Sequence, residues 1–230
     1  VSLIRQTYPP DEIIVADGGS TDRTREVARE AAPAARIVRA EGGRGGQIAA
    51  GIAEASAEWV VVLHADAELP PEALAVLRRA VVADRSVLGG AFGQRFGSAA
   101  PELLLIEVLN EVRALFTRTA FGDQAQFFHR PSAVAHALMP AQPLMEDVEA
   151  SWRTRETGGF LYLGYPAKVD DRKWRRPDWW RRFALVFRFV ARYRWARLRG
   201  GARAERLSHQ LFAEYYPHAA RENPDTGDAV

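Results

Sequence analysis

The sequence predicts an α/β fold in which a largely parallel sheet is covered by helices on both faces. Short apolar runs alternate with helix-patterned segments through the first half of the chain, and a polar loop follows each apolar run. In sheets of this kind, ligands bind beyond the carboxyl ends of the strands. We therefore expect the loops at 17–22, 41–47 and 64–68 to converge on one site.

The elements of the first half follow from local patterns. The β-branched run "EIIVA" is typical of a buried strand, and Thr21 or Asp22 can cap the helix that follows. Pro70 and Pro71 stand where a missing N–H costs a helix little. Strands are expected over 12–16, 35–40 and 58–69, helices over 21–32 and 70–83, and a glycine-rich loop entering a helix over 41–56.

The second half is less regular. We expect a glycine-interrupted strand over 87–96, an amphipathic helix over 101–118, strands over 125–130 and 159–169, and a long helix over 176–195. The chain then divides into a main domain over 1–175, a basic amphipathic helical segment over 176–216 and a flexible tail over 217–230.

Composition limits the classes of protein and of site. The 230 residues include no cysteine, which excludes disulfides and thiolate metal sites. No apolar run reaches the roughly 20 residues that cross a bilayer. We expect a cytoplasmic protein, with peripheral attachment at the inner face of the plasma membrane left open.

Charge is unevenly distributed along the chain. The net charge is +2, yet the segment from Asp171 to Arg206 carries 13 basic and 3 acidic residues. Arg181, Arg188, Arg192 and Arg199 gather on one face of the expected helix. The opposite face collects Trp179, Phe183, Val186, Phe187, Val190 and Tyr193. This helix either packs on its own domain or rests, through 176–199, on anionic lipid. No recognised module frames the arginines for nucleic acid.

Three loops carry polar groups suited to a nucleotide. Asp17 either caps the next helix or accepts hydrogen bonds from a base or ribose, with the following glycines letting a ligand approach. Arg44, between two glycine pairs, suits a phosphate or base, although a plain flexible loop stays open. Neither a P-loop nor a dinucleotide fingerprint is present.

Two further clusters carry acidic chemistry. His64 and Asp66, two apart at a strand end, share a face and form half a shell for Mg²⁺ or Mn²⁺, unless Asp66 only caps the next helix. The adjacent Glu146 and Asp147 can raise one another's pKa, which suits a general base, although a solvated helix start is the plainer interpretation.

Together these motifs resemble glycosyltransferase family 2, whose members have the Rossmann-like GT-A fold. "VADGGSTDRT" is similar to the family's nucleotide-binding strand end, "HADAEL" to its DxD metal motif, and "EDVEASWR" to its motif with the catalytic base. The order and spacing of the three agree over about residues 3–175. Segment 121–130 is similar to a subgroup of small bacterial members that write the metal motif as HAD.

The resemblance implies a metal-dependent, inverting sugar transfer from a nucleotide-diphosphate sugar to a hydroxyl acceptor that a membrane lipid could carry. Asp147, with Glu146, would be the base, and Asp66 and His64 would bind Mg²⁺ or Mn²⁺. Since His64 replaces an aspartate, Mg²⁺ should bind less tightly and Mn²⁺ be favoured. The nucleotide would contact Asp17, Gly18, Gly19, Ser20, Arg44, His64 and Asp66. The acceptor or diphosphate side would hold Asp123, Gln124, Arg172 and Trp174, with Lys173 beside them.

Two other functions compete with this one. The replacement by His64 gives weight to a non-catalytic relative that binds a nucleotide or tethers a complex to membrane. A nucleotidyltransferase would share the fold class, but the basic glycine-rich loop expected near its first strand is not visible.

The resemblance also implies an earlier strand. Family members carry a strand and most of a helix before the Asp17 strand, and that strand lies in the middle of the sheet. We expect the first strand to be missing here, leaving the Asp17 strand with one unpaired edge.

Overall fold

The computed structural model describes residues 2–172, 174–175 and 177–217. It contains two hydrogen-bonded sheets. Strands β1 (Ile14–Asp17) and β2 (Arg36–Arg39) form a parallel pair, and a second sheet has the strand order β3-β6-β5-β7-β4. Lys173, named above, lies outside the described residues, as does the expected tail from position 218 onward.

The second sheet is mixed. Strands β5 (Val87–Phe96) and β7 (Gly159–Val169) run parallel, while β6 (Gln126–His129) pairs antiparallel with β5 and with β3 (Trp59–Val61), and β4 (Ala67–Glu68) antiparallel with β7. The two parallel ladders hold more residue pairs than the three antiparallel ones. The predicted mixed, mainly parallel α/β fold is confirmed.

The Asp17 strand is paired on one side. Within the described residues, β1 pairs only with β2 and β3 only with β6, so no ladder joins the two sheets. This agrees with the expected unpaired edge.

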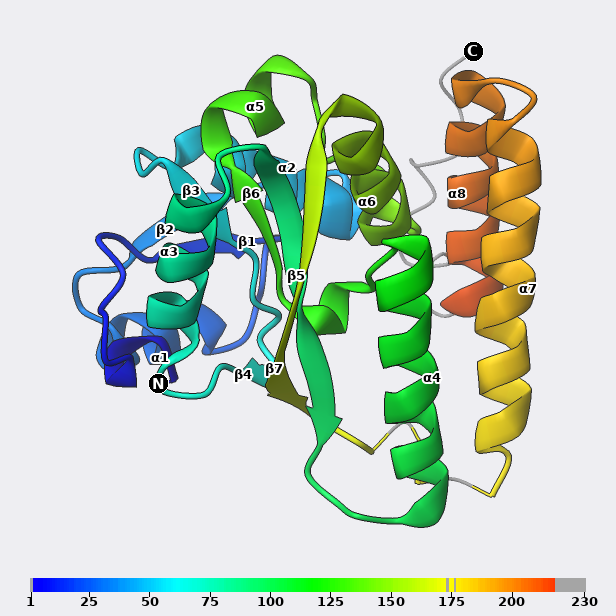
Figure 1. The fold of residues 1–230 in the computed structure, drawn as a ribbon, viewed down its shortest axis with the longest axis horizontal. Helices are drawn as coiled ribbons and strands as arrows, with labels where there is room; N and C mark the ends of the chain where they lie inside the picture. Colours follow the sequence, from blue (N-terminus) through cyan, green and yellow to red (C-terminus); the bar gives the residue numbers. More distant parts are fainter. Residues whose placement is uncertain (1, 173, 176, 218–230) are drawn as a thin grey trace.

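Helices cover the sheet in layers (Figure 1). One apolar cluster joins α3 (Ala73–Ala83) to β5 through Leu77, Val81 and Phe92, and another joins α4 (Pro101–Thr117) to β5 and β7 through Leu103, Ile106 and Val169. The remaining helices among the described residues are η1 (Ser2–Arg5), α1 (Thr24–Ala31), α2 (Gly43–Glu54), η2 (Gly122–Gln124), α5 (Arg130–Ala135), α6 (Glu146–Thr157), α7 (Trp179–Arg197) and α8 (Gly201–Tyr215).

Helices α7 and α8 form an outer layer against α6 (Figure 1). Trp152 of α6 stacks on Tyr193 of α7, with ring centroids 6.1 Å apart. The Tyr193 hydroxyl reaches Gln142, and Arg197 pairs with Glu149 at 2.8 Å. The C-terminal helices therefore pack on the helix that carries Glu146 and Asp147. No described helix has the length and apolarity that a membrane span requires.

Three local predictions were wrong. The expected strand over 58–69 is broken, because His64, Ala65 and Asp66 form a turn between β3 and β4, so His64 and Asp66 do not share a strand face. The loop that enters the helix of segment 41–56 is shorter than expected, since α2 already begins at Gly43. The apolar face of the long helix is rotated, because Phe189 is buried while Phe187 is 43% exposed.

The glycines of α2 serve packing. A β-carbon on Gly45 would lie 2.3 Å from the carbonyl oxygen of Gln142 and 2.4 Å from that of Pro140. No side chain fits at that distance, so the start of α2 lies directly against the segment that leads into α6. This contact brings Arg44 to the first turn of α6.

Candidate active site

A cavity lies between the end of the larger sheet and helices α4, α6 and α7. Six predicted site residues line it: Arg44, His64, Asp66, Asp123, Asp147 and Trp174. Its other walls include Asn110, Phe121, Gly122, Asp170, Phe183 and Tyr216. Groups from widely separated loops are thus brought to one place.

Asp147 is held by backbone donors in the first turn of α6. Its Oδ2 accepts a hydrogen bond from the N–H of Gly122 at 2.7 Å, and its Oδ1 accepts one from the N–H of Val148 at 2.8 Å. The position at a helix N-terminus also favours a negative charge. A carboxylate has about four lone-pair sites, so two remain to accept a proton from a ligand in the cavity.

The half-buried Arg44 forms an ion pair with the buried Glu146 beside Asp147. The Arg44 Nε donates to Glu146 Oε1, and Arg44 Nη2 lies 3.8 Å from Asp147 Oδ2. Burial lowers the pKa of Arg44, but the charges of Glu146 and Asp147 outweigh burial and raise it. Glu146 is fully buried, and its desolvation, together with the charge of Asp147, raises its pKa to about 7 despite Arg44.

Asp123 is a second carboxylate in the cavity wall, and it is half-buried. Burial raises its pKa to about 6, while the charge of Arg113 acts in the opposite direction. Its Oδ1 accepts no hydrogen bond from the described residues. This oxygen is therefore placed to meet a ligand donor.

The pKa of Glu146 leads to a pH prediction. A carboxyl whose folded pKa lies above its unfolded value stabilises the protein below the unfolded pKa, and this stabilisation is lost as pH rises through the folded value. For Glu146 the window runs from about 4.5 to about 7. Glu146→Gln cannot ionise, so its stability relative to wild type should rise across this window by at most about 3 kcal/mol. Thermal unfolding of both proteins at pH 5 and pH 8 measures this; a difference that is constant or falls would contradict it.

Two donors in the cavity are suited to a divalent cation. Asp66 is exposed, and His64 lies beside it in the turn before β4. Among the described residues, no group of three or more His, Asp or Glu side chains is arranged to hold a metal. This set fits a cation shared with a diphosphate, because Mg²⁺ in nucleotide sites uses one or two carboxylates plus phosphate oxygens.

The other predicted site residues lie outside the cavity lining. Asp17 accepts hydrogen bonds from the Ser20 N–H at 3.1 and 3.3 Å, and hydrogen bonding by Ser20 lowers its pKa. The buried Gln124 accepts hydrogen bonds from Arg113 and from the N–H of Phe121. Arg172 pairs with Asp170 at 2.6 Å.

The Asp17 loop reaches the cavity through α2. A β-carbon on Gly18 would lie 2.2 Å from Gln47 Nε2, so this loop touches α2. Gln47 lies one turn after Arg44, which lines the cavity. The Asp17 loop and the cavity residue Arg44 therefore both adjoin the first turns of α2.

Gly122 is a site residue that the sequence analysis missed. A β-carbon there would lie 2.4 Å from His64 Cε1 and 3.5 Å from Asp147 Oδ2, so the residue separates the imidazole from the carboxylate. The dipeptide Gly122-Asp123 at the end of an apolar segment was the available signal. Asn110 and Phe183, which also line the cavity, gave no such signal.

Replacing Gly122 tests this contact. In Gly122→Ala the methyl group must displace the His64 ring, because no β-carbon tolerates a 2.4 Å contact. Affinity for nucleotide with Mn²⁺ should fall by about tenfold, equivalent to about 1.4 kcal/mol, while the fold is kept. Gly164→Ala is the matched control, since nothing lies within 4 Å of its β-carbon. Calorimetry measures both, and equal affinities would contradict the contact.

Comparison with known proteins shows the family of this chain. The glycosyl transferase family 2 model matches residues 1–139. The chain belongs to glycosyltransferase family 2. No curated protein matches the sequence.

Solved glycosyltransferase structures share the fold at low identity. A mannosyltransferase from Pyrobaculum calidifontis, PcManGT, crystallised with GDP-Man and Mn²⁺, superimposes with a TM-score of 0.60 at 17% identity, over 100% of this chain and 70% of its own. S. aureus TarS 1-349 with UDP-GlcNAc gives 0.59 at 15% identity, over 100% and 71%. Another S. aureus TarS structure gives 0.58 at 17%, over 74% of this chain and 33% of TarS. This chain thus spans a third of that TarS chain, and the predicted GT-A fold is confirmed.

Proposed function

We propose that this family 2 glycosyltransferase moves a sugar from a nucleotide-diphosphate sugar to a hydroxyl acceptor with inversion, using Asp147 as the general base. The observation that carries the proposal is the shared cavity: Asp147 faces the same space as Arg44, His64 and Asp66. Such a transfer has two requirements: a base for the acceptor hydroxyl, and cationic or metal-binding groups for the diphosphate.

In this proposal Asp147 removes the proton of the acceptor hydroxyl while the oxygen of that hydroxyl attacks the anomeric carbon. The bond from that carbon to the diphosphate oxygen breaks, and the nucleoside diphosphate leaves with the electron pair. Arg44 neutralises part of the charge that develops on the leaving group. Glu146 orients Arg44 through their ion pair.

A divalent metal, bound by Asp66 and His64, would stabilise the leaving diphosphate. PcManGT, whose structure contains Mn²⁺, supports this proposal. The nucleotide would lie over Asp17, Gly18, Gly19 and Ser20 and run along α2 to Arg44. Asp123 and Trp174 would contact the acceptor or diphosphate from the cavity wall, with Gln124 and Arg172 behind them.

Donor turnover tests the function. The chain is incubated with UDP-GlcNAc or GDP-Man, with Mn²⁺ or with a chelator, and with simple alcohol and sugar acceptors. We expect release of UDP or GDP that requires the metal. Pyrophosphate release would indicate a nucleotidyltransferase instead. Nucleotide binding without release under every condition would favour the non-catalytic relative, to which the replacement by His64 gives weight.

A further inference from the structure

The arginines near the α7–α8 connection differ in their partners. Several are paired with carboxylates: Arg188 and Arg192 with Glu214, each at 2.7 Å, and Arg197 with Glu149 and Glu156. These ion pairs join α7 to α8 and to α6. Arg199, Arg203 and Arg206 make no ion pair within the described residues.

Arg199, Arg203 and Arg206 surround an open hollow between α7 and α8. The hollow measures about 310 Å³, and four arginines line it: Arg192, Arg199, Arg203 and Arg206. We name this surface the basic groove. Glu214, on Arg192, is its one carboxylate contact among the described residues. Four guanidinium groups against one carboxylate create a strongly positive surface, and Arg pairs with phosphate in bidentate geometry.

Two large apolar side chains are exposed at this end of α7: Trp195 lines the basic groove, and Leu198 precedes Arg199 in the chain. Trp195 is 57% exposed and Leu198 75% exposed. The guanidinium of Arg199 lies 3.9 Å from the centre of the Trp195 ring, so cation and indole form one unit. Exposed Trp and Leu side chains do not contribute to binding a free phosphate ion. At a bilayer surface, by contrast, Trp lies at the headgroup level and Leu just below it.

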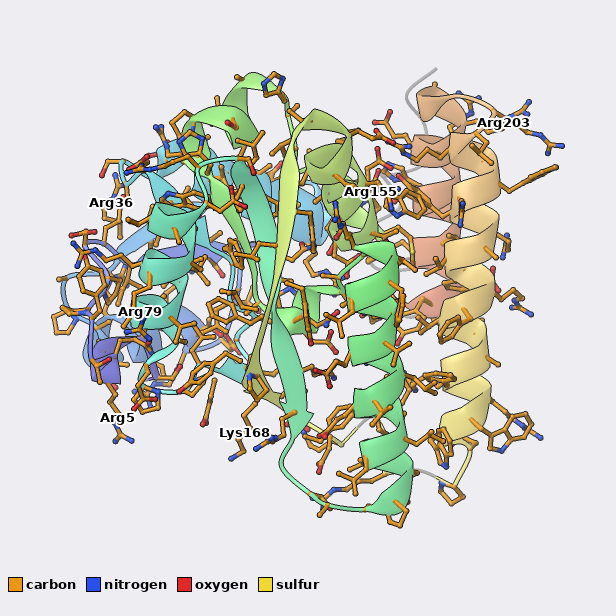
Figure 2. The ribbon with its side chains drawn as sticks, viewed as in Figure 1. Arg5, Arg36, Arg79, Arg155, Lys168 and Arg203 are labelled. Atoms are coloured by element: carbon orange, nitrogen blue, oxygen red, sulfur yellow. The ribbon has the colours of Figure 1, made fainter. Side chains whose placement is uncertain are left out.

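The groove is separate from the transfer cavity. The α7 side chains that line the cavity are Phe183, Val186, Phe187 and Phe189, toward the beginning of the helix, whereas those in the groove belong to its last two turns. In Figure 2, Arg203 projects outward near the α7–α8 turn, on the side of the molecule opposite Arg5 and Arg79.

We propose that the basic groove docks the protein on the phosphate groups of an anionic membrane surface, with Trp195 and Leu198 entering the headgroup layer. The helices remain peripheral. Because the groove is separate from the cavity, this docking does not depend on the proposed sugar transfer.

Vesicle binding of the full chain tests the proposal. Sedimentation is compared between vesicles of phosphatidylcholine alone and vesicles with equal parts of phosphatidylglycerol. Wild type should bind only the anionic vesicles. Each arginine at such a surface contributes about fivefold in affinity, so the triple variant R199Q/R203Q/R206Q should bind on the order of 100-fold more weakly. Trp195→Ser should also weaken binding with all arginines present.

The matched control carries the same charge change elsewhere. R5Q/R29Q/R79Q removes three exposed arginines without an ion pair among the described residues, from elements remote from the groove. It should bind vesicles as wild type does. Both triple variants should keep the wild-type melting temperature and nucleotide affinity, since none of the six residues lines the cavity.

Three results would overturn the proposal. Equal vesicle binding by the two triple variants would show that the vesicles attract positive charge anywhere on the protein and not the basic groove in particular. Calorimetric binding of inorganic phosphate at the groove, lost in R199Q/R203Q/R206Q but without vesicle binding, would assign the groove to a soluble phosphate. Tighter binding to an RNA oligonucleotide than to anionic vesicles would assign it to nucleic acid. Failure of sugar transfer alone would leave the vesicle results unchanged.

Discussion

Asp147→Asn should lower the rate of sugar transfer by about 10² or more, the scale of a general base, while leaving donor binding nearly intact. The base acts on the acceptor hydroxyl and not on the nucleotide, so the two readouts separate. Initial rates of UDP or GDP release and calorimetry with the same nucleotide measure them. Near-normal turnover in the variant would exclude Asp147 as the base.

This substitution also changes a hydrogen bond, which requires a control. Asn offers one acceptor oxygen where Asp147 uses two, for Gly122 and Val148, so one buried N–H loses its partner at a cost of about 1–3 kcal/mol. Glu149→Gln is the matched variant, because it lies on the same helix, is buried and loses ion pairs with Arg153 and Arg197. It should lose similar stability yet keep turnover. Equal loss of turnover in both variants would attribute the effect to α6 as a whole.

Asp66→Ala should remove the metal-dependent part of nucleotide binding, and His64→Ala should weaken it less. A carboxylate oxygen is the better ligand for Mg²⁺ or Mn²⁺, whereas a neutral imidazole brings no charge. Calorimetry with UDP or GDP, with and without Mn²⁺, measures the difference. Wild type should bind more tightly with Mn²⁺, and Asp66→Ala equally with and without it.

Glu68→Ala serves as the matched control for Asp66→Ala. Glu68 is an exposed carboxylate two positions further on, in β4, and it does not line the cavity. Glu68 carries the same charge in the same region. Because it does not line the cavity, its loss should leave the Mn²⁺ effect on nucleotide binding unchanged. If Asp66→Ala binds nucleotide with the full Mn²⁺ dependence, the metal lies elsewhere.

Strands β5 and β7 were predicted to the residue, because glycine or charged residues lie at their ends and most of their interior residues are apolar or glycine. The turn at His64 was not, since an apolar run continues past Val61 and only pairing with His129 and Phe127 shows where β3 stops. Periodicity predicts the interior of a strand, whereas the end of a strand depends on where its partner strand ends.

The site was predictable to a similar degree. Convergence of strand-end loops predicts that Arg44 and Asp66 meet at one site, and the family resemblance places Asp147 with them. Gly122 and Asn110 belong to a turn and a helix whose place in the fold depends on long-range packing. Likewise, only the three-dimensional structure shows that Arg188 and Arg197 are held in ion pairs, which distinguishes them from the groove residues Arg199, Arg203 and Arg206.

The β5–β7 ladder has a consequence for how the protein folds. It pairs Val87 with Gly159, and all of α4, β6, α5 and α6 lies between the two strands. Closing so long a stretch of chain costs entropy before the ladder repays it, which slows folding. Asp147 lies inside this stretch and meets Gly122 only when α6 has packed on the closed sheet. During refolding, transfer activity should therefore return as one of the last signals, after the helical content has recovered.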